Sequence, residues 1–296
     1  MNQILNRICV LFLPFLFSGI ISAQSKGSDY IPYYAEIYKA DSLFMLKKYD
    51  ESYPIMDQVF QKYKPVNVWF VDASRNYLVS KSKVSQVDYK DIENYLRQKA
   101  YDTNAVFKDK EIVEILEKFN LKKEDIQAIV KENIRTINWP VREELAQMTR
   151  DDQKVRTAIK NNDSIVQTDR KHSERLKEII TMYGFPGKKV TGEYLVEGQH
   201  SGISLELLFN HMSYNGDYKY FKQILPEFIK KGSCSPFIFA TMEDRRNEIE
   251  NKAPDYYVIA AVPPDADRKE INRKRRLIGM PSLEYQEFKI QALMAE

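Results

Sequence analysis

The chain has 296 residues, of which 43% are hydrophobic and 29% are charged, with 45 Lys and Arg against 42 Asp and Glu. This length suits one large domain or two small ones and excludes a peptide or a disordered tail. The net charge of +3 is small and evenly distributed, which excludes the basic footprint of a nucleic-acid-binding protein. With only 10 Gly and 12 Pro, the chain lacks the turn residues of an all-β fold, so we expect an all-α, or mainly α, protein.

The N-terminus has the order of a secretory signal peptide. Arg7 precedes an apolar run at 8–21 that ends in the sequence SAQ, so residues 1–23 are predicted to be removed by cleavage after Ala23. An uncleaved anchor is the alternative, but the run of about 14 residues is shorter than the roughly 20 that span a bilayer. We therefore expect a periplasmic or secreted protein with no transmembrane segment after cleavage.

Cleavage leaves Cys234 as the single cysteine of the mature chain, which excludes an internal disulfide. Because no neighbour in the sequence is suited to stabilise its thiolate, we do not expect Cys234 to be a nucleophile.

Residues 30–135 form a Tyr-rich region that is predicted to be helical. It holds more than half of the 19 tyrosines, and its apolar residues recur at helical spacing. Two helices, the second at 51–63 and closed by Pro65, resemble a tetratricopeptide-type hairpin, although no second copy follows at a period of 34 residues. Further helices are predicted at 67–80, 87–100, 110–119 and 121–133, the last of them capped by Asn120.

The segment around Trp139 is the predicted boundary to a second helical region at 140–292. Pro140 fits the first turn of a new helix, because its missing N–H has no partner there in any case. Residues 256–262 (YYVIAAV) are the one segment that we consider as a short strand. Helices are predicted from 140 to about 160, then to 183, and at 202–214, 217–230, 236–251, 265–278 and 282–293.

Several polar residues of this second region are candidates for a site. Asp152 and Arg156 are four positions apart, and this spacing favours an exposed ion pair on one helix face. His200 and His211 are 11 positions apart, so within one helix they lie about 16 Å from each other, too far to share a metal ion. A lone histidine beside an apolar face is more often a hydrogen-bonded core residue than a ligand.

Asp244 and Arg245 follow an apolar helix face and fit either an anion site or a structural clamp. No spacing matches a zinc, P-loop, dinucleotide or serine-hydrolase motif, so we expect neither a metal nor a cofactor. The basic run at 268–276 is interleaved with acidic residues, which favours a solvated helix face over attachment to an anionic surface such as lipid headgroups.

Five short motifs together resemble the bacterial DUF6624 family of uncharacterised proteins over about residues 140–290. In chain order they are DDQKVR (151–156), YGFPG (183–187), FNHM (209–212), ATMEDRR (240–246) and INRKRRLIGMPSLEYQ (271–286). The family-like positions are Asp152, Gln153, Arg156, Gly184, Pro186, Gly192, His211, Asp244 and Arg245.

The chain departs from the family pattern at three places. Tyr183 replaces a histidine, Asn210 replaces a glutamine, and DYYVIA (255–260) replaces a YGTQ-like stretch. Because the family has no assigned activity, the resemblance implies candidate residues and no reaction.

Two functions follow as hypotheses. The first is an exported helical binding or interaction protein, whose partner is an unknown protein or a small anionic ligand. We prefer it because the sequence holds no complete catalytic set. The alternative is a hydrolase-like enzyme in which His211 is the acid or base, Asp152 or Asp244 orients it, and Arg156 or Arg245 holds an anionic group. Gln153 and His200 are further binding candidates.

Overall fold

The structure is a computed structural model that describes residues 29–66, 68 and 70–295. Helices make up 68% of it, and a two-stranded antiparallel hairpin is the only sheet in the described part of the chain, so the predicted mainly α fold is confirmed. None of the described helices combines the length and apolar character needed to cross a membrane. The predicted signal peptide at 1–23 lies outside the described residues.

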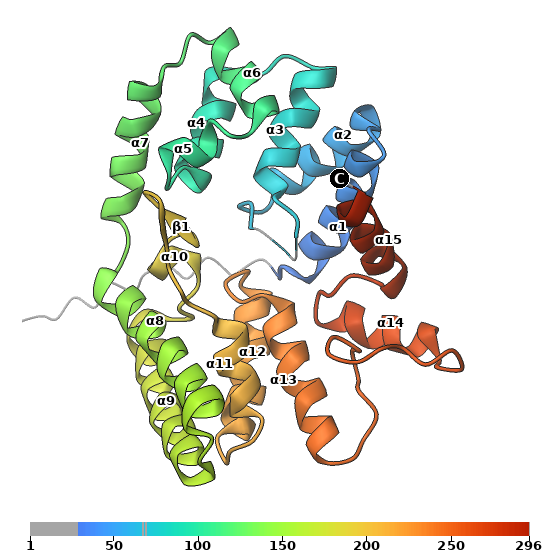
Figure 1. Cartoon of the computed structure of the whole chain (residues 1–296). Coiled ribbons are helices and arrows are strands. Elements are labelled where there is room, and N and C mark those ends of the chain that lie inside the picture. The colour runs from blue at the N-terminus through green and yellow to red at the C-terminus, as the bar shows by residue number, and fades with distance from the viewer. Residues whose placement is uncertain (1–28, 67, 69, 296) are drawn as a thin grey trace, which may run out of the picture.

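The helices follow one another around a ring-like path (Figure 1). The first part of the chain forms α1 (Ile31–Met45), α2 (Tyr49–Phe60), α3 (Ala73–Val84), α4 (Tyr89–Lys99), α5 (Thr103–Val106), α6 (Lys110–Lys118) and α7 (Lys123–Arg135). The second part forms α8 (Trp139–Lys154), the π-helix η1 (Val155–Ile159), α9 (Asn162–Tyr183), α10 (Lys188–Thr191), β1 (Leu195–Val196), β2 (Gln199–His200), α11 (Leu205–Met212), α12 (Tyr218–Lys230), α13 (Pro236–Ile249), α14 (Arg268–Leu277) and α15 (Leu283–Ala295).

Local signals explain most of the helix ends. Pro140 lies in the first turn of α8, as predicted, and the side chain of Asn138 caps that helix by accepting the N–H of Val141 at 3.3 Å. The start of α3 differs from the prediction, because the carboxylate of Asp72 accepts the N–H of Arg75 at 3.2 Å and begins the helix there rather than at 67.

Two other predictions about local structure are wrong. Asn120 does not cap α7: it has a φ of 52°, and the helix begins after Lys122, whose N–H is accepted by the Asp125 carboxylate at 2.8 Å. Residues 256–262 form no strand, because the carboxylate of Asp244 accepts two of their backbone N–H groups and holds them as a loop. The two strands lie instead at 195–200.

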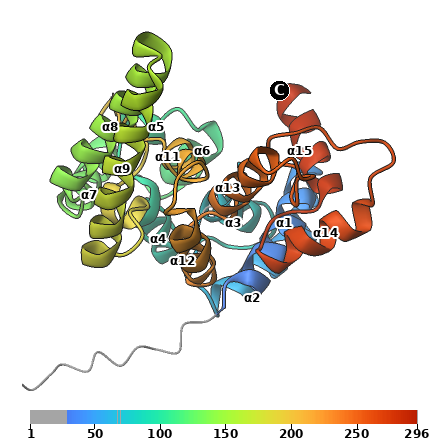
Figure 2. The ribbon, with the colours of Figure 1, turned by 90° about the horizontal axis from the view of Figure 1, so that it is seen from below.

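The main hydrophobic core joins the two ends of the chain. Tyr34 of α1 belongs to the same buried cluster as Phe209 and Phe221, and its hydroxyl donates to the carbonyl of Ile229 at 3.0 Å. Figure 2 shows α1 beside α14 and α15, in agreement with their contacts. Residues of α3 to α7 form a second cluster. The predicted boundary near Trp139 falls between α7 and α8, and as a division into domains it stays a prediction.

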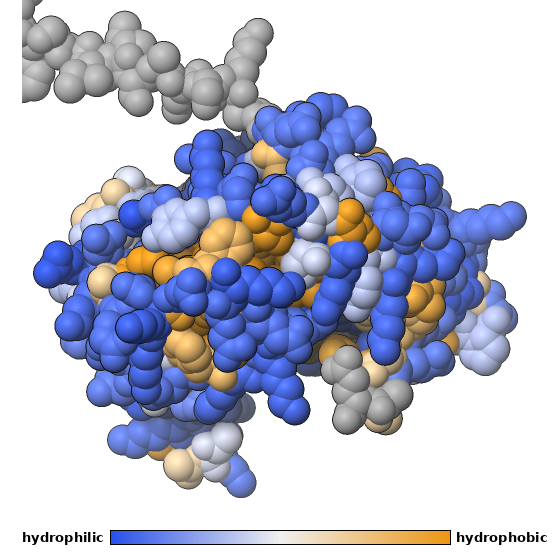
Figure 3. All heavy atoms as spheres, turned by 90° about the horizontal axis from the view of Figure 1, so that it is seen from above, coloured by the Kyte–Doolittle hydropathy of each residue, from blue (hydrophilic) through white to orange (hydrophobic). Residues whose placement is uncertain are grey.

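The face at the top of Figure 1 is largely hydrophilic, with hydrophobic residues visible between the polar side chains (Figure 3).

Candidate functional site

His211 and Asp152 form a close pair at the junction of α8 and α11. His211 Nδ1 lies 2.6 Å from Asp152 Oδ1, although the two residues are 59 positions apart in the chain. The side chain of Asp152 is 1% exposed and that of His211 is 12% exposed. Because a ring nitrogen and a carboxylate oxygen at this distance share a proton, we infer that the Nδ1–H of His211 donates to Asp152. The other ring nitrogen, Nε2, can then contact a different group.

Arg156 completes the cluster. Its Nε lies 3.2 Å from Asp152 Oδ1 and 3.1 Å from His211 Nδ1, and its Nη2 lies 2.5 Å from Asp169 Oδ1. The predicted ion pair with Asp152 therefore forms, but it is partly buried, and the guanidinium is shared with a second carboxylate, whereas the four-residue spacing predicts an exposed pair. One guanidinium thus balances two buried carboxylates.

A π-helical turn, η1, positions Arg156. It continues α8 and ends at Lys160, whose φ is 54°. Asn161 then begins α9 by accepting the N–H of Ser164 at 2.9 Å, so the chain reverses direction within a few residues. π-Turns widen a helix and occur often at functional sites. Here the turn places the guanidinium between α8, which carries Asp152, and α9, which carries Asp169.

The environments of the two carboxylates separate their pKa values. Burial alone raises the pKa of Asp152, but the hydrogen bonds from His211 and Gln153 and the charge of Arg156 outweigh it, and the pKa is lowered. For Asp169, burial exceeds the effect of Arg156, and the pKa is raised. Such a separation is typical of functional carboxylates and also of structural ion-pair networks.

Asp169 and His172 are site residues that the sequence analysis did not single out. His172 is 3% exposed, burial lowers its pKa, and its Nδ1 has no hydrogen-bond partner among the described residues. Both lie on the buried face of α9, together with Ser173 and Leu176. Polar residues at core-facing positions of an amphipathic helix are the signal that points to them.

Asp152, Asp169 and His211 place possible ligand atoms within 4.8 Å of one another. The guanidinium of Arg156 contacts all three residues and already supplies the positive charge that a metal ion would bring. A metal would have to displace it, so we assign no metal to this cluster.

Of the other predicted site residues, only Gln153 lies in the cluster of Asp152, Arg156 and His211. Gln153 joins the cluster, because its Nε2 donates to Asp152 Oδ2 at 2.9 Å. Asp244 does not: it is fully buried and accepts the backbone N–H groups of Tyr256 and Val258 at 2.9 and 2.8 Å. Arg245 pairs with Glu248.

His200 lies in β2, and its ring is 4.9 Å from that of Tyr194. It is therefore on a different element from His211, which lies in α11. His200 also lines a small pocket of about 170 Å³ beside Trp139.

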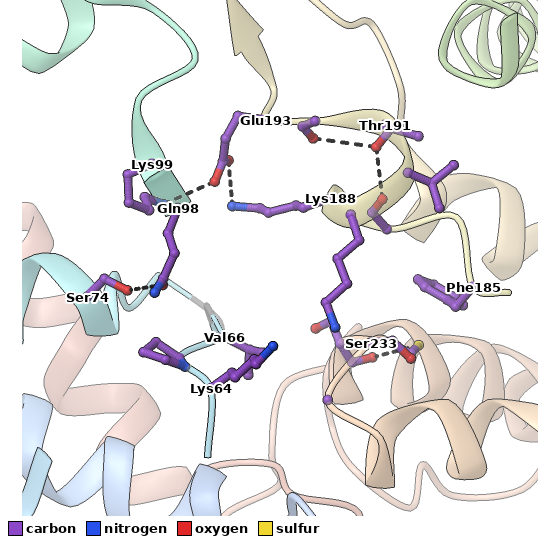
Figure 4. Close-up of a pocket in the computed structure, with 18 of the residues that line it drawn as sticks. Lys64, Val66, Ser74, Gln98, Lys99, Phe185, Lys188, Thr191, Glu193 and Ser233 are labelled. Atoms are coloured by element: carbon purple, nitrogen blue, oxygen red, sulfur yellow. Dashed lines mark hydrogen bonds and ion pairs between the residues drawn. The ribbon is translucent and has the colours of Figure 1, made fainter. Parts of the chain in front are cut away.

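A much larger cavity than the pocket beside Trp139 lies elsewhere. It is a central cleft of about 1380 Å³, between the segment from α2 to α4 on one side and the segments around α10 and the start of α13 on the other (Figure 4). Its charged lining residues are mostly basic: Lys62, Lys64, Arg97, Lys99, Arg142, Lys188, Lys189 and Lys231, against Asp57, Asp91, Glu193 and Glu206. Aromatic side chains, including Tyr63, Tyr101, Tyr183, Phe185 and Phe228, make up much of the remaining lining.

Glu193 connects two lysines in the wall of the cleft. Its Oε2 lies 2.6 Å from Lys188 Nζ and its Oε1 lies 3.2 Å from Lys99 Nζ (Figure 4). Burial opposes ionisation of Glu193, but the two lysines outweigh it and lower its pKa. Glu193 is thus paired within the wall, Lys99 also pairs with Asp72 at 2.9 Å, and Arg97 pairs with Glu93 and Glu132. The lining cations without an acidic partner among the described residues are Lys62, Lys64, Arg142, Lys189 and Lys231.

Arg142 is a buried cation without an acidic partner among the described residues. It is 5% exposed, and its guanidinium donates to the carbonyls of Thr191 and Glu193, the second at 2.7 Å. Burial lowers its pKa. Arg142 thus holds the backbone after α10 in place and adds positive charge at the wall of the cleft.

Comparison with known proteins gave no match: no family model matches the chain, and no curated protein or solved structure is significantly similar to it.

Proposed function

We propose that the protein is a helical binding protein that takes an anionic ligand in its central cleft. The observation that carries the proposal is the basic and aromatic lining of a cleft of about 1380 Å³. This volume exceeds the roughly 300–1,000 Å³ of common small-molecule sites, so the cleft has room for a ligand larger than a single small metabolite.

The charge balance of the cleft supports an anion over a cation. Two of its four acidic residues, Asp91 and Glu193, form ion pairs with lysines. Glu206 faces the cleft, and desolvation by the surrounding walls raises its pKa, which weakens its negative charge further. Basic side chains with aromatic neighbours suit carboxylate or phosphate groups joined to an apolar body.

Thermal-shift titration at low salt tests this proposal, with citrate and pentaglutamate as probes. The variants Lys64→Glu and Lys231→Glu reverse two charges that line the cleft, and Lys131→Glu on α7 is the matched control outside it. We expect both probes to stabilise the wild type and the control, and to stabilise the cleft variants much less. Equal responses of all three variants, or no response of the wild type, would contradict the proposal.

A second candidate function rests on the geometry of His211. A histidine whose Nδ1 is held by a buried carboxylate at 2.6 Å is oriented for proton transfer at Nε2, which is the arrangement that a hydrolase-like enzyme requires. Asp152, rather than Asp244, is then the orienting residue. Arg156 is engaged by two carboxylates and so is better suited to positioning Asp152 than to holding a substrate.

Chromogenic esters and phosphoesters test this second candidate. His211→Asn removes the proton-transfer group, and His200→Asn is the control because His200 is exposed in β2. We expect hydrolysis by the wild type and by the control but not by His211→Asn. Equal rates in the two variants would exclude His211 as the acid or base.

We further infer relationship to the DUF6624 family from the ordered motifs. Asp152 and Arg156 of the first motif and His211 of a later one contact each other, and this supports the idea that the motifs serve one site. A DUF6624 structure in which the corresponding residues lie apart would contradict it.

A further inference from the structure

Lys188 stands out among the lysines of the cleft by its neighbours. It is the first residue of α10, a single turn between Gly187 and Gly192, and it lines the cleft. Its Nζ lies 2.6 Å from Glu193 Oε2, and the other oxygen of that carboxylate lies 3.2 Å from Lys99 Nζ (Figure 4).

Access differs within this cluster. The side chains of Glu193 and Lys99 are only 17% and 14% exposed, whereas that of Lys188 is 54% exposed. Lys188 is therefore the member that a molecule in the cleft meets, with the carboxylate and the second ammonium behind it.

We propose that Lys188 is an amine nucleophile that forms an imine with the carbonyl group of an anionic aldehyde or keto acid bound in the central cleft. The proposal uses the same cleft as the proposed binding function. The basic residues of the lining attract the acid group of the ligand, and Lys188 reacts with its carbonyl carbon.

The electrostatic setting favours the reactive form of the amine. Desolvation lowers the pKa of Lys188, and the positive charge of Lys99 lowers it further, although Glu193 and Asp72, the two carboxylates that pair with Lys99, oppose both effects. A lysine whose pKa is lowered beside another cation is a recognised arrangement for amine nucleophiles, because a larger fraction of the amine is neutral.

The reaction balances with the groups present. Glu193 accepts a proton from the Lys188 ammonium, and the neutral amine attacks the carbonyl carbon to form a C–N bond. The carbonyl π electrons move to oxygen, which takes up the proton that the attacking nitrogen loses, and this gives a neutral carbinolamine. Loss of its hydroxyl group as water, with Glu193 returning the proton, leaves a protonated imine. No oxidant or reductant is required.

Reductive trapping tests the proposal. The full protein is incubated at pH 7 with glyoxylate and cyanoborohydride, and modified lysines are quantified by peptide mass spectrometry. We expect Lys188 to be trapped several-fold faster than Lys189 and Lys64, which line the same cleft and serve as internal controls. Equal or slower trapping at Lys188 would overturn the proposal.

The variant Lys99→Gln tests the electrostatic part. It removes the cation that lowers the pKa of Lys188 and leaves Glu193 and Asp72, which both raise that pKa, without their ion pair to Lys99. Trapping at Lys188 should therefore slow, while trapping at Lys64 is unchanged. An unchanged or faster rate at Lys188 would contradict the role of Lys99. Circular dichroism of the variant establishes that it is folded.

Citrate distinguishes this inference from the binding function. Citrate is an anion without a reactive carbonyl, so it should bind in the cleft and slow trapping at Lys188. If citrate neither slows trapping at Lys188 nor shifts the melting temperature, Lys188 is still a nucleophile but the anion-binding function is excluded. If citrate shifts the melting temperature but Lys188 is not trapped preferentially, the anion-binding function is supported and the nucleophile is excluded.

Discussion

Lys289 and Asp41 form a buried ion pair between residues that are 248 positions apart in the chain, with Nζ 2.9 Å from Oδ2. Their side chains are 8% and 1% exposed. The Asp41 carboxylate also accepts the Tyr285 hydroxyl and the Asn76 amide, each at 2.8 Å. One carboxylate thus joins α1, α3 and α15, and closes the ring of helices.

Replacing Lys289 by Ala should destabilise the protein by about 3–5 kcal/mol, because it leaves a buried carboxylate without its cation. The double variant Asp41→Asn with Lys289→Met should recover part of this loss. Urea denaturation gives both values. Lys48→Ala is the control: it breaks an exposed pair with Glu51 and should change stability by at most about 1 kcal/mol. A loss for Lys289→Ala no larger than for the control would refute the structural role.

Gly279→Ala should destabilise the fold by roughly 1–3 kcal/mol. Gly279 has a φ of 79°, which side chains rarely adopt, and a Cβ added there overlaps the ring of Tyr34. Gly216→Ala is the matched control, since a Cβ at Gly216 has no neighbour within 4 Å. Thermal unfolding of the two variants measures the difference, and similar midpoints would show that α1 does not pack closely on this turn.

Acid should destabilise the protein partly through His172. Its pKa in the folded state lies below the ordinary value of 6.5, so the unfolded chain takes up the proton first as pH falls. The contribution of His172 to the free energy of unfolding is therefore fully present above about pH 6.5. It decreases as pH falls from there to the lowered pKa of the folded state. Burial lowers the pKa of His172, the charge of Lys171 lowers it further, and together they outweigh the carboxylates of Asp152, Asp151 and Asp169, which raise it.

Denaturation midpoints between pH 7.5 and 5 should fall less steeply in His172→Leu than in the wild type. His200→Asn, at an exposed histidine, should behave as the wild type does. Parallel pH profiles for His172→Leu and the wild type would show that His172 does not contribute.

Expression of the full chain in a bacterium should give a mature protein in the periplasm or medium that begins at Gln24. This follows from the charged, apolar and small-residue order of residues 1–23. Intact-mass spectrometry measures the N-terminus, and replacing Ala23 by Arg should block processing. A mature protein that retains Met1 and sediments with membranes would support the uncleaved anchor instead.

Local patterns predicted much of the helical framework but only part of the site. Pro140 and the segment 236–251 predicted helices correctly, although the second helix ends at Ile249. A proline in the first turn of a helix acts locally, so both starts can be recognised without a fold. The β-branched and aromatic residues of the segment 256–262 predict a strand. The buried carboxylate of Asp244 nevertheless holds this segment as a loop. Tertiary contacts override such weak local preferences.

The sequence by itself determined the mainly helical class, the approximate helix positions, and the candidates Asp152, Gln153, Arg156 and His211. Helix periodicity, caps and four-residue spacings are properties of neighbouring residues, so they can be read without a fold. Only the tertiary structure decided that Arg156 balances Asp152 and Asp169 beside His211, and that Lys188 meets Glu193 and Lys99 in a basic cleft. These contacts depend on a π-turn and on helix packing between distant segments, for which local sequence carries no signal.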